Sequence, residues 1–153
     1  GIDVHVLDKV RTGPKPDLVK RLGGRYHHDT DALAVGYDLT LECSGTGALM
    51  VEALCRTAAT GTACLVGIPS AGQPAEVDLG GLNRQLVLTN QLVIATMTAN
   101  RRHFEEAIQS LTRADHDWLA AMITRRLALA DWQDAFDSPE EQVKTVISLS
   151  EAG

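Results

Sequence analysis

The feature that most limits the possible folds of this chain is a regular alternation between short apolar runs and stretches with helical periodicity. The runs with strand character occupy residues 2–7, 37–43, 62–66 and 91–96. The stretches with helical character occupy residues 17–22, 48–59 and 82–88. Strands that alternate with helices predict βαβ units, which connect by right-handed crossovers into a parallel sheet. We therefore predict an α/β fold built on a doubly wound, mostly parallel sheet.

Length, charge and cysteine content exclude several other classes of protein. The chain has 153 residues, of which 44% are hydrophobic, which suits one domain with a core. Its net charge of -6 provides no basic surface for nucleic acid. No apolar run approaches the ~18 residues of a membrane span. Its three cysteines lack C-x-x-C spacing, so neither a zinc site nor a disulfide framework is expected. We expect a cytoplasmic protein that binds neither nucleic acid nor a membrane.

Beyond residue 100 the alternation fades. An amphipathic helix with Asn100 as its cap is followed by a shorter helical segment around Trp118 and another at residues 131–136. Residues 143–149 alternate between apolar and polar side chains, which predicts a final strand.

The sequence LECSGTG is the part that most resembles a nucleotide-binding motif. A pyrophosphate-binding loop reads G-x-G-x-x-G, and an acidic residue ends the following strand about 20 residues later. Gly45 and Gly47 fit the first two positions, but Met50 stands at the third. The following strand ends at Gly67 with no acid, and the acid that does end a strand, Asp8, comes before the loop. This order predicts that the first strand of a nucleotide-binding fold and its glycine loop lie upstream of the segment.

Several stretches, spread over nearly the whole chain, carry a more specific signal. They are IDVHVLDKVRTGPKPDLVKRLGG, YDLTLECSGTG, GTACLVGIPSAG, LNRQLVLTNQLVIATMTANRRHFEEAI and QVKTVISL. Together they resemble the C-terminal portion of glucose dehydrogenases in the zinc-dependent medium-chain dehydrogenase superfamily. The most specific part is the strand followed by ANRRHF, because this combination is not a general feature of Rossmann folds.

The resemblance implies a function and a domain organisation. The family oxidises the first carbon of an aldose to a lactone and transfers the hydride to NAD or NADP. Residues 1–115 would be a partial Rossmann domain, and residues 116–153 would return toward a zinc-bearing catalytic domain. The zinc ligands would lie outside the segment, so no catalytic residue or metal ligand is expected within it, and alone it should be inactive. The family also implies a sugar or alcohol substrate and a homodimer or homotetramer.

By the same resemblance, Asp8, Lys9 and Val10 lie beside the adenosine ribose. Members that use NADP resemble Asn-Arg-Arg at this place, which suits a 2′-phosphate. A carboxylate instead accepts hydrogen bonds from a free 2′-hydroxyl and repels the phosphate, so Asp8 favours NAD. Lys9 and Arg11 are nearby cations that act in the opposite direction.

The other positions carried over from the family lie mostly at the ends of other strands. These cofactor-binding residues are Ser44, Gly45, Val66, Gly67, Ile68, Thr96, Met97, Thr98 and Lys144. Thr98 also matches the residue that contacts the sugar, where the family commonly has an asparagine. A hydroxyl is shorter than an amide and has one donor where the amide has two. This departure leaves the identity of the substrate open.

Two alternative interpretations remain. A methyltransferase-like nucleotide fold, with S-adenosylmethionine as its ligand, also ends its second strand in an acid, as Asp8 does. A non-catalytic dimerisation or regulatory module would keep the sheet without the chemistry. A hydrolase is not expected, because Ser70 in GIPSAG lacks the G-x-S-x-G spacing of a nucleophilic serine.

Overall fold

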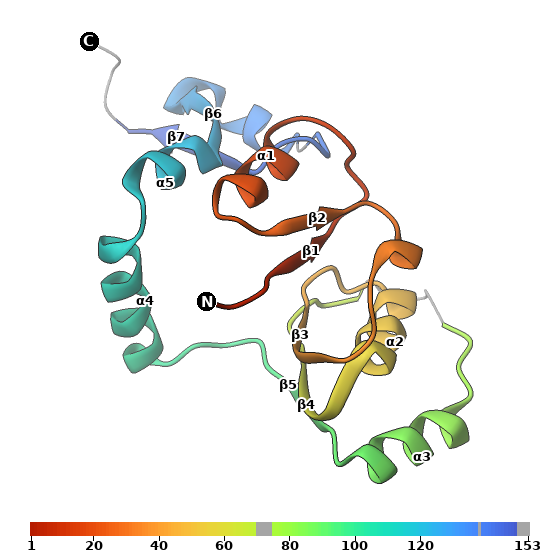
Figure 1. The fold of residues 1–153 in the computed structure, drawn as a ribbon. Helices are drawn as coiled ribbons and strands as arrows, with labels where there is room; N and C mark the ends of the chain where they lie inside the picture. The colour runs from red at the N-terminus through yellow and green to blue at the C-terminus, as the bar shows by residue number, and fades with distance from the viewer. Residues whose placement is uncertain (70–74, 138, 150–153) are drawn as a thin grey trace. The chain divides into compact units, whose positions relative to one another are not determined.

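A computed structural model of the chain describes residues 1–69, 75–137 and 139–149 (Figure 1). The chain forms two compact units. Unit 1 combines Gly1–Leu33 with Arg101–Gly153, and unit 2 is Ala34–Asn100. Every strand pair in the described residues is parallel, which confirms the predicted α/β fold with parallel pairing.

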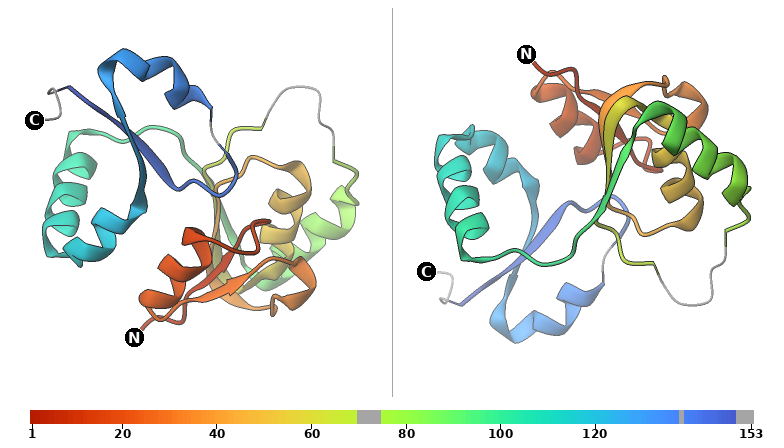
Figure 2. Two further views of the ribbon diagram at one scale, coloured as in Figure 1. Left: turned by 90° about the horizontal axis from the view of Figure 1, so that it is seen from above. Right: turned by 90° about the horizontal axis from the view of Figure 1, so that it is seen from below.

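Unit 2 contains a three-stranded sheet with the order β3-β4-β5. Its strands are β3 (Tyr37–Glu42), β4 (Thr57–Leu65) and β5 (Leu92–Ala95). Helix α2 (Gly47–Arg56) crosses from β3 to β4, and helix α3 (Leu79–Thr89) lies between β4 and β5 in the sequence. Figure 2 shows both helices beside the strands, and both contact β4. The central strand carries Ala63, the most buried apolar residue of the unit, at 1% exposure.

The boundary between α2 and β4 differs from the prediction. The helical pattern predicted a helix to residue 59, but α2 ends at Arg56 and residues 57–61 belong to β4. The helix ends where Thr57 turns to an extended backbone, and the buried Thr57 hydroxyl bonds the Ala53 carbonyl at 2.7 Å. Thr60 then adopts a positive φ of 60°, within an irregularity that shifts the register between β3 and β4.

Helix α3 begins earlier than its apolar pattern indicates. Its cap is Asp78, whose carboxylate accepts a hydrogen bond from the Gly81 N–H at 2.9 Å. The prediction of a start at residue 82 was wrong because Gly80 and Gly81 in the first turn have no side chains to show a helical period. Asn90 ends the helix in the left-handed conformation, with φ of 52°.

Unit 1 begins with a parallel pair, β1 (His5–Leu7) and β2 (Arg25–His27), connected through α1 (Pro14–Arg21) and followed by the short helix η1 (Thr30–Ala32). The helical pattern was predicted to begin at residue 17, but α1 begins three residues earlier. Gly13 occupies the cap with φ of 98°, and two prolines fill the first turn, where a missing N–H has no cost.

The rest of unit 1 comes from the C-terminal part of the chain. Its elements are α4 (Arg101–Arg113), α5 (His116–Met122), β6 (Ile123–Ala128), η2 (Leu129–Phe136) and β7 (Lys144–Ser148). Strand β6 pairs with β7 and was missed, because two adjacent arginines interrupt the apolar pattern of ITRRLA. Trp118 joins α5 to α1 by donating its indole N–H to the Leu18 carbonyl at 2.8 Å. In the part of the chain that is described, no helix is long and apolar enough to span a membrane.

Candidate functional site

Asp8 stands at the end of β1, where its carboxylate is held by two donors. Its Oδ1 accepts a hydrogen bond from the Val10 N–H at 3.0 Å, and its Oδ2 lies 2.8 Å from the Lys15 ammonium. Both side chains of this ion pair are partly buried, with 29% and 24% of their surface exposed. The backbone N–H of Asp8 donates to the His27 carbonyl at 3.1 Å, so Asp8 is also fixed to β2.

This environment keeps Asp8 ionised. Burial acts to raise the pKa of its carboxyl, but the hydrogen bonds from Lys15 and the Val10 N–H and the charges of Lys15 and Lys9 outweigh it, and the pKa is lowered. Lys15 has no signal in the sequence that points to this contact. Lys15 lies in the first turn of α1, directly after Gly13, whose φ is 98°.

Lys9 and Val10 have different surroundings from Asp8. Lys9 is exposed and pairs with Glu140, whose hydrogen bond raises the pKa of the lysine. Val10 is buried at 7% exposure, and its carbonyl accepts a hydrogen bond from the Tyr26 hydroxyl at 2.6 Å. Burial and the charge of Asp8 raise the pKa of Tyr26, so it remains a donor at neutral pH. The turn after β1 is therefore anchored through the buried Val10, while Lys9 lies at the surface.

The LECSGTG loop in unit 2 is built around Glu42, a residue that the sequence analysis did not single out. Glu42 is the last residue of β3 and is only 5% exposed. Its Oε1 accepts hydrogen bonds from the N–H and the hydroxyl of Ser44 at 2.8 and 2.5 Å. The Gly45 N–H lies 3.2 Å from Oε1 and 3.1 Å from Oε2. These two N–H groups therefore bond a protein carboxylate, and the loop does not present them to a phosphate.

A close backbone approach joins this loop to the end of β4. Gly45 has φ of 71°, and a Cβ there would lie 2.5 Å from the Ile68 carbonyl oxygen. A Cβ on Gly67 would overlap the Gly45 N and lie 2.7 Å from its Cα. The backbone N–H groups of Val66 and Gly67 both donate to the Glu42 carbonyl, at 2.8 and 2.9 Å. The two strand ends consequently fit together only because both contact residues are glycines.

The segment after β5 continues the same edge of the sheet. Thr96 is tied to β4 by its N–H, which donates to the Leu65 carbonyl at 3.1 Å. Thr96, Met97 and Thr98 are exposed, as are Val66 and Ile68 after β4. Within unit 2, the structure thus brings together the carboxyl ends of three parallel strands, where ligands of open α/β sheets bind.

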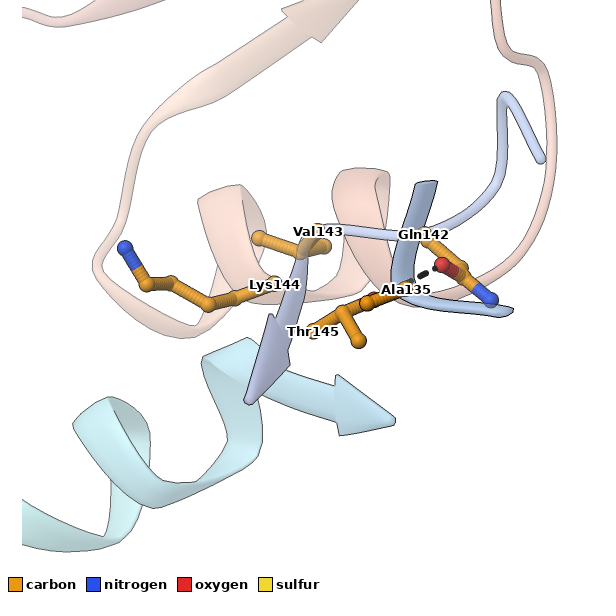
Figure 3. A pocket seen from close by; sticks show the side chains of 5 residues that line it. All are labelled: Ala135, Gln142, Val143, Lys144 and Thr145. Atoms are coloured by element: carbon orange, nitrogen blue, oxygen red, sulfur yellow. Dashed lines mark hydrogen bonds between the residues drawn. The ribbon is translucent and has the colours of Figure 1, made fainter. Parts of the chain in front are cut away.

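Lys144 opens β7 in unit 1 and lines a shallow cavity of about 310 Å³ with Ala135, Gln142, Val143 and Thr145. Figure 3 shows its side chain extending away from Gln142, which accepts a hydrogen bond from the Thr145 hydroxyl at 3.0 Å. The lysine is exposed, and within the described residues its ammonium makes no ion pair.

At their strand ends, unit 1 presents an anchored carboxylate and unit 2 presents exposed segments after β4 and β5. The ionised carboxylate at the end of β1 is an acceptor for hydroxyl groups, whereas Gly45 and Gly67 at the ends of β3 and β4 pack closely against protein backbone. No group of three or more potential metal ligands is found in the part of the chain that is described. Ser70 lies outside the described residues.

Comparisons with known proteins identify the family of the chain. The model of the family described as glucose dehydrogenase C-terminus matches residues 1–149. A glucose 1-dehydrogenase from Halobacterium salinarum is 34% identical over 147 residues, which cover 91% of this chain and 41% of that protein. Glucose 1-dehydrogenase 2 from Vulcanisaeta moutnovskia is 32% identical over 139 residues, covering 88% of this chain and 40% of that protein.

The fold is also similar to that of solved structures. A structure of Haloferax mediterranei glucose dehydrogenase in complex with NADP, Zn and gluconolactone has a TM-score of 0.86 and 25% identity, and the match covers 98% of this chain and 44% of that one. An alcohol dehydrogenase from Thermotoga maritima, at 18% identity and a TM-score of 0.78, shows the same fold. The chain thus spans about 40% of the curated relatives that it matches. These matches favour the dehydrogenase over the methyltransferase-like alternative.

Proposed function

We propose, because this chain belongs to the glucose dehydrogenase C-terminus family, that it forms the cofactor-binding part of an NAD(P)-dependent dehydrogenase. The reaction is the oxidation of an aldose such as glucose to a lactone, with the nicotinamide as hydride acceptor. The observation that carries the proposal is the ionised, anchored carboxylate of Asp8 at the end of β1. Zinc and its ligands belong, in this proposal, to the part of the relatives that the match does not cover.

In unit 1, Asp8 accepts hydrogen bonds from the adenosine ribose, while Lys9 and Val10 flank it. Each carboxylate oxygen already accepts one protein hydrogen bond and retains further lone pairs for ribose hydroxyl groups. Lys15 keeps the carboxyl ionised, and an ionised Asp8 favours NAD over NADP because it repels a 2′-phosphate.

In unit 2, the proposed cofactor surface is the edge where the strands end. Ser44 and Gly45 follow β3, Val66, Gly67 and Ile68 follow β4, and Thr96, Met97 and Thr98 follow β5. In this proposal Gly45 and Gly67 shape the backbone edge that faces the ligand, and Thr98 contacts both nicotinamide and sugar. Lys144 in unit 1 supplies a positive charge for the cofactor; its exposed position supports this role.

The assembly and location of the protein complete the proposal. We expect a homodimer or homotetramer that takes a small sugar or alcohol as substrate and binds neither nucleic acid nor a membrane. The described cysteines are free, which is consistent with a reducing, cytoplasmic compartment.

The test is calorimetric titration of NAD and of NADP into the intact protein, followed by the same titrations with Asp8→Ala. We expect NAD to bind more tightly than NADP in the wild type. The substitution should cost NAD about 1–2 kcal/mol, as for a lost hydrogen bond, and should strengthen NADP binding because it removes the repulsion of the 2′-phosphate.

Asp17→Asn is the matched control, since Asp17 is an exposed carboxylate on α1 of the same unit. It should leave both dissociation constants unchanged. Absence of binding by either nucleotide to the wild type would refute the proposed function. Equal losses for NAD and NADP in Asp8→Ala would refute the role of Asp8 alone.

A further inference from the structure

We propose that Glu42 is a positioning residue, whose buried carboxylate holds the 43–45 loop in the shape that meets the cofactor. The inference rests on the proposed function, because it assigns to that site a residue that does not itself touch the ligand. The N–H groups of Ser44 and Gly45 bond this carboxylate and are not directed at a phosphate.

The burial and bonding of Glu42 identify its role. A carboxylate that is 5% exposed is costly unless its oxygens are bonded. Here the donors are the Ser44 N–H, the Ser44 hydroxyl and the Gly45 N–H, all from the two residues that follow Cys43. The side chain therefore bonds its own loop, and it fixes three donors that would otherwise allow several loop conformations.

The backbone of the same residue connects the loop to the next strand. The Glu42 carbonyl accepts the N–H groups of Val66 and Gly67, while a Cβ on Gly67 would overlap the Gly45 N. One residue thus sets the position of both glycines at the sheet edge. If the carboxylate were lost, Gly45 could move away from Gly67, and the surface offered to the ligand would change shape.

The chemistry favours a carboxylate over an amide at this position. All the groups that face Glu42 in the loop are donors, and an ionised carboxylate is an acceptor at both oxygens. In Glu42→Gln, one terminal group becomes an NH₂, which opposes the Gly45 N–H or the Ser44 donors. The amide can still accept with its single oxygen, so Glu42→Gln should retain part of the effect that Glu42→Ala abolishes.

The experiment measures nucleotide binding and loop protection in the intact protein. Calorimetry gives the dissociation constant of the better-binding nucleotide for the wild type, Glu42→Gln and Glu42→Ala. We expect an increase of about tenfold for the glutamine variant and a larger increase for the alanine variant. Amide hydrogen exchange without nucleotide should be faster at Ser44 and Gly45 in both variants.

Two controls separate positioning from general stability. Thr57→Val removes a buried hydroxyl that bonds Thr40 and Ala53, at the opposite end of the β3–β4 pair. It should lower the unfolding temperature but leave the dissociation constant within about twofold. Glu52→Gln is the matched charge control, because Glu52 pairs with Arg56 on α2 and does not contact the loop.

The outcomes are distinct. Weaker binding in the order wild type, Glu42→Gln, Glu42→Ala, with both controls unchanged, supports the inference. Wild-type dissociation constants in the Glu42 variants, or an equal weakening in Thr57→Val, overturn it while the proposed function stands. If the wild type binds neither nucleotide, the proposed function fails and the inference fails with it.

Discussion

Gly67→Ala tests the fit between the two strand ends most directly. A Cβ on this glycine would overlap the Gly45 N and would lie 2.7 Å from the Gly45 Cα and 2.8 Å from the Cys43 carbonyl carbon. Gly67 is not among the glycines with positive φ, so the substitution adds a clash without backbone strain. All three obstructing atoms are backbone atoms, which cannot rotate out of the way.

The size of the stability loss follows from the part of the backbone that must move to admit the new Cβ. Relief of the clash requires the 43–45 loop to shift, which strains its bonds to Glu42 and the two N–H bonds from Val66 and Gly67 to the Glu42 carbonyl. Overpacking in a rigid environment costs about 1–3 kcal/mol. Because no side chain can yield here, we expect a loss near the upper end, about 3 kcal/mol. Urea unfolding of the intact protein, followed by far-ultraviolet circular dichroism, measures the change.

Gly80→Ala is the matched control within the same unit. A Cβ there meets only the Asp78 Oδ1, at an ordinary contact distance of 3.5 Å. Gly80 lies inside α3, so alanine should stabilise the protein by about 0.5–1 kcal/mol. A Gly67→Ala protein within about 0.5 kcal/mol of the wild type would refute the backbone contact.

Two further predictions concern charged residues. Asp8 has a lowered native pKa, so its contribution to stability is complete above the ordinary carboxyl pKa of 3.8 and is lost as the pH falls through the native value. The difference in unfolding free energy between wild type and Asp8→Asn should therefore disappear in acid, and a difference independent of pH would contradict this. Asp78→Ala removes the cap of α3 at Gly81 and should cost about 1 kcal/mol in urea unfolding. No loss would show that water replaces the cap.

The arrangement of strands was predictable because it follows from hydrophobic periodicity. Short apolar runs separated by helical patterns allow few pairings, and the observed β3-β4-β5 order with parallel register is among them. The exact ends of elements were less predictable. The α2 helix stops at Arg56, where Thr57 turns to an extended backbone, and the apolar pattern carries no trace of this change. The predicted domain boundary at residue 115 stays a prediction.

The two residues that the sequence analysis missed share one cause. Lys15 and Glu42 both form their bonds beside a turn or loop that contains a glycine with positive φ, Gly13 near the lysine and Gly45 near the glutamate. Neither glycine conformation can be derived from local propensity. A usable signal exists for Glu42, since an acid at the end of an apolar strand, directly before a glycine loop, needs donors when it is buried.

The pairing of Asp8 with Lys15 changes how the acid at the end of β1 affects the choice between NAD and NADP. A bare carboxylate repels a 2′-phosphate, but an ammonium 2.8 Å from Oδ2 offsets much of that charge and is itself able to pair with a phosphate. We therefore expect only a modest preference for NAD in the wild type and a sharper one in Lys15→Met. The Lys15→Met substitution should weaken the binding of NADP relative to that of NAD by about three- to fivefold, as for the loss of a partly exposed ion pair.

The control is Lys20→Met, on the last turn of α1, and calorimetry with both nucleotides gives the ratio of the two dissociation constants. An unchanged ratio in Lys15→Met would show that Lys15 only fixes the orientation of Asp8 and takes no part in the choice of nucleotide.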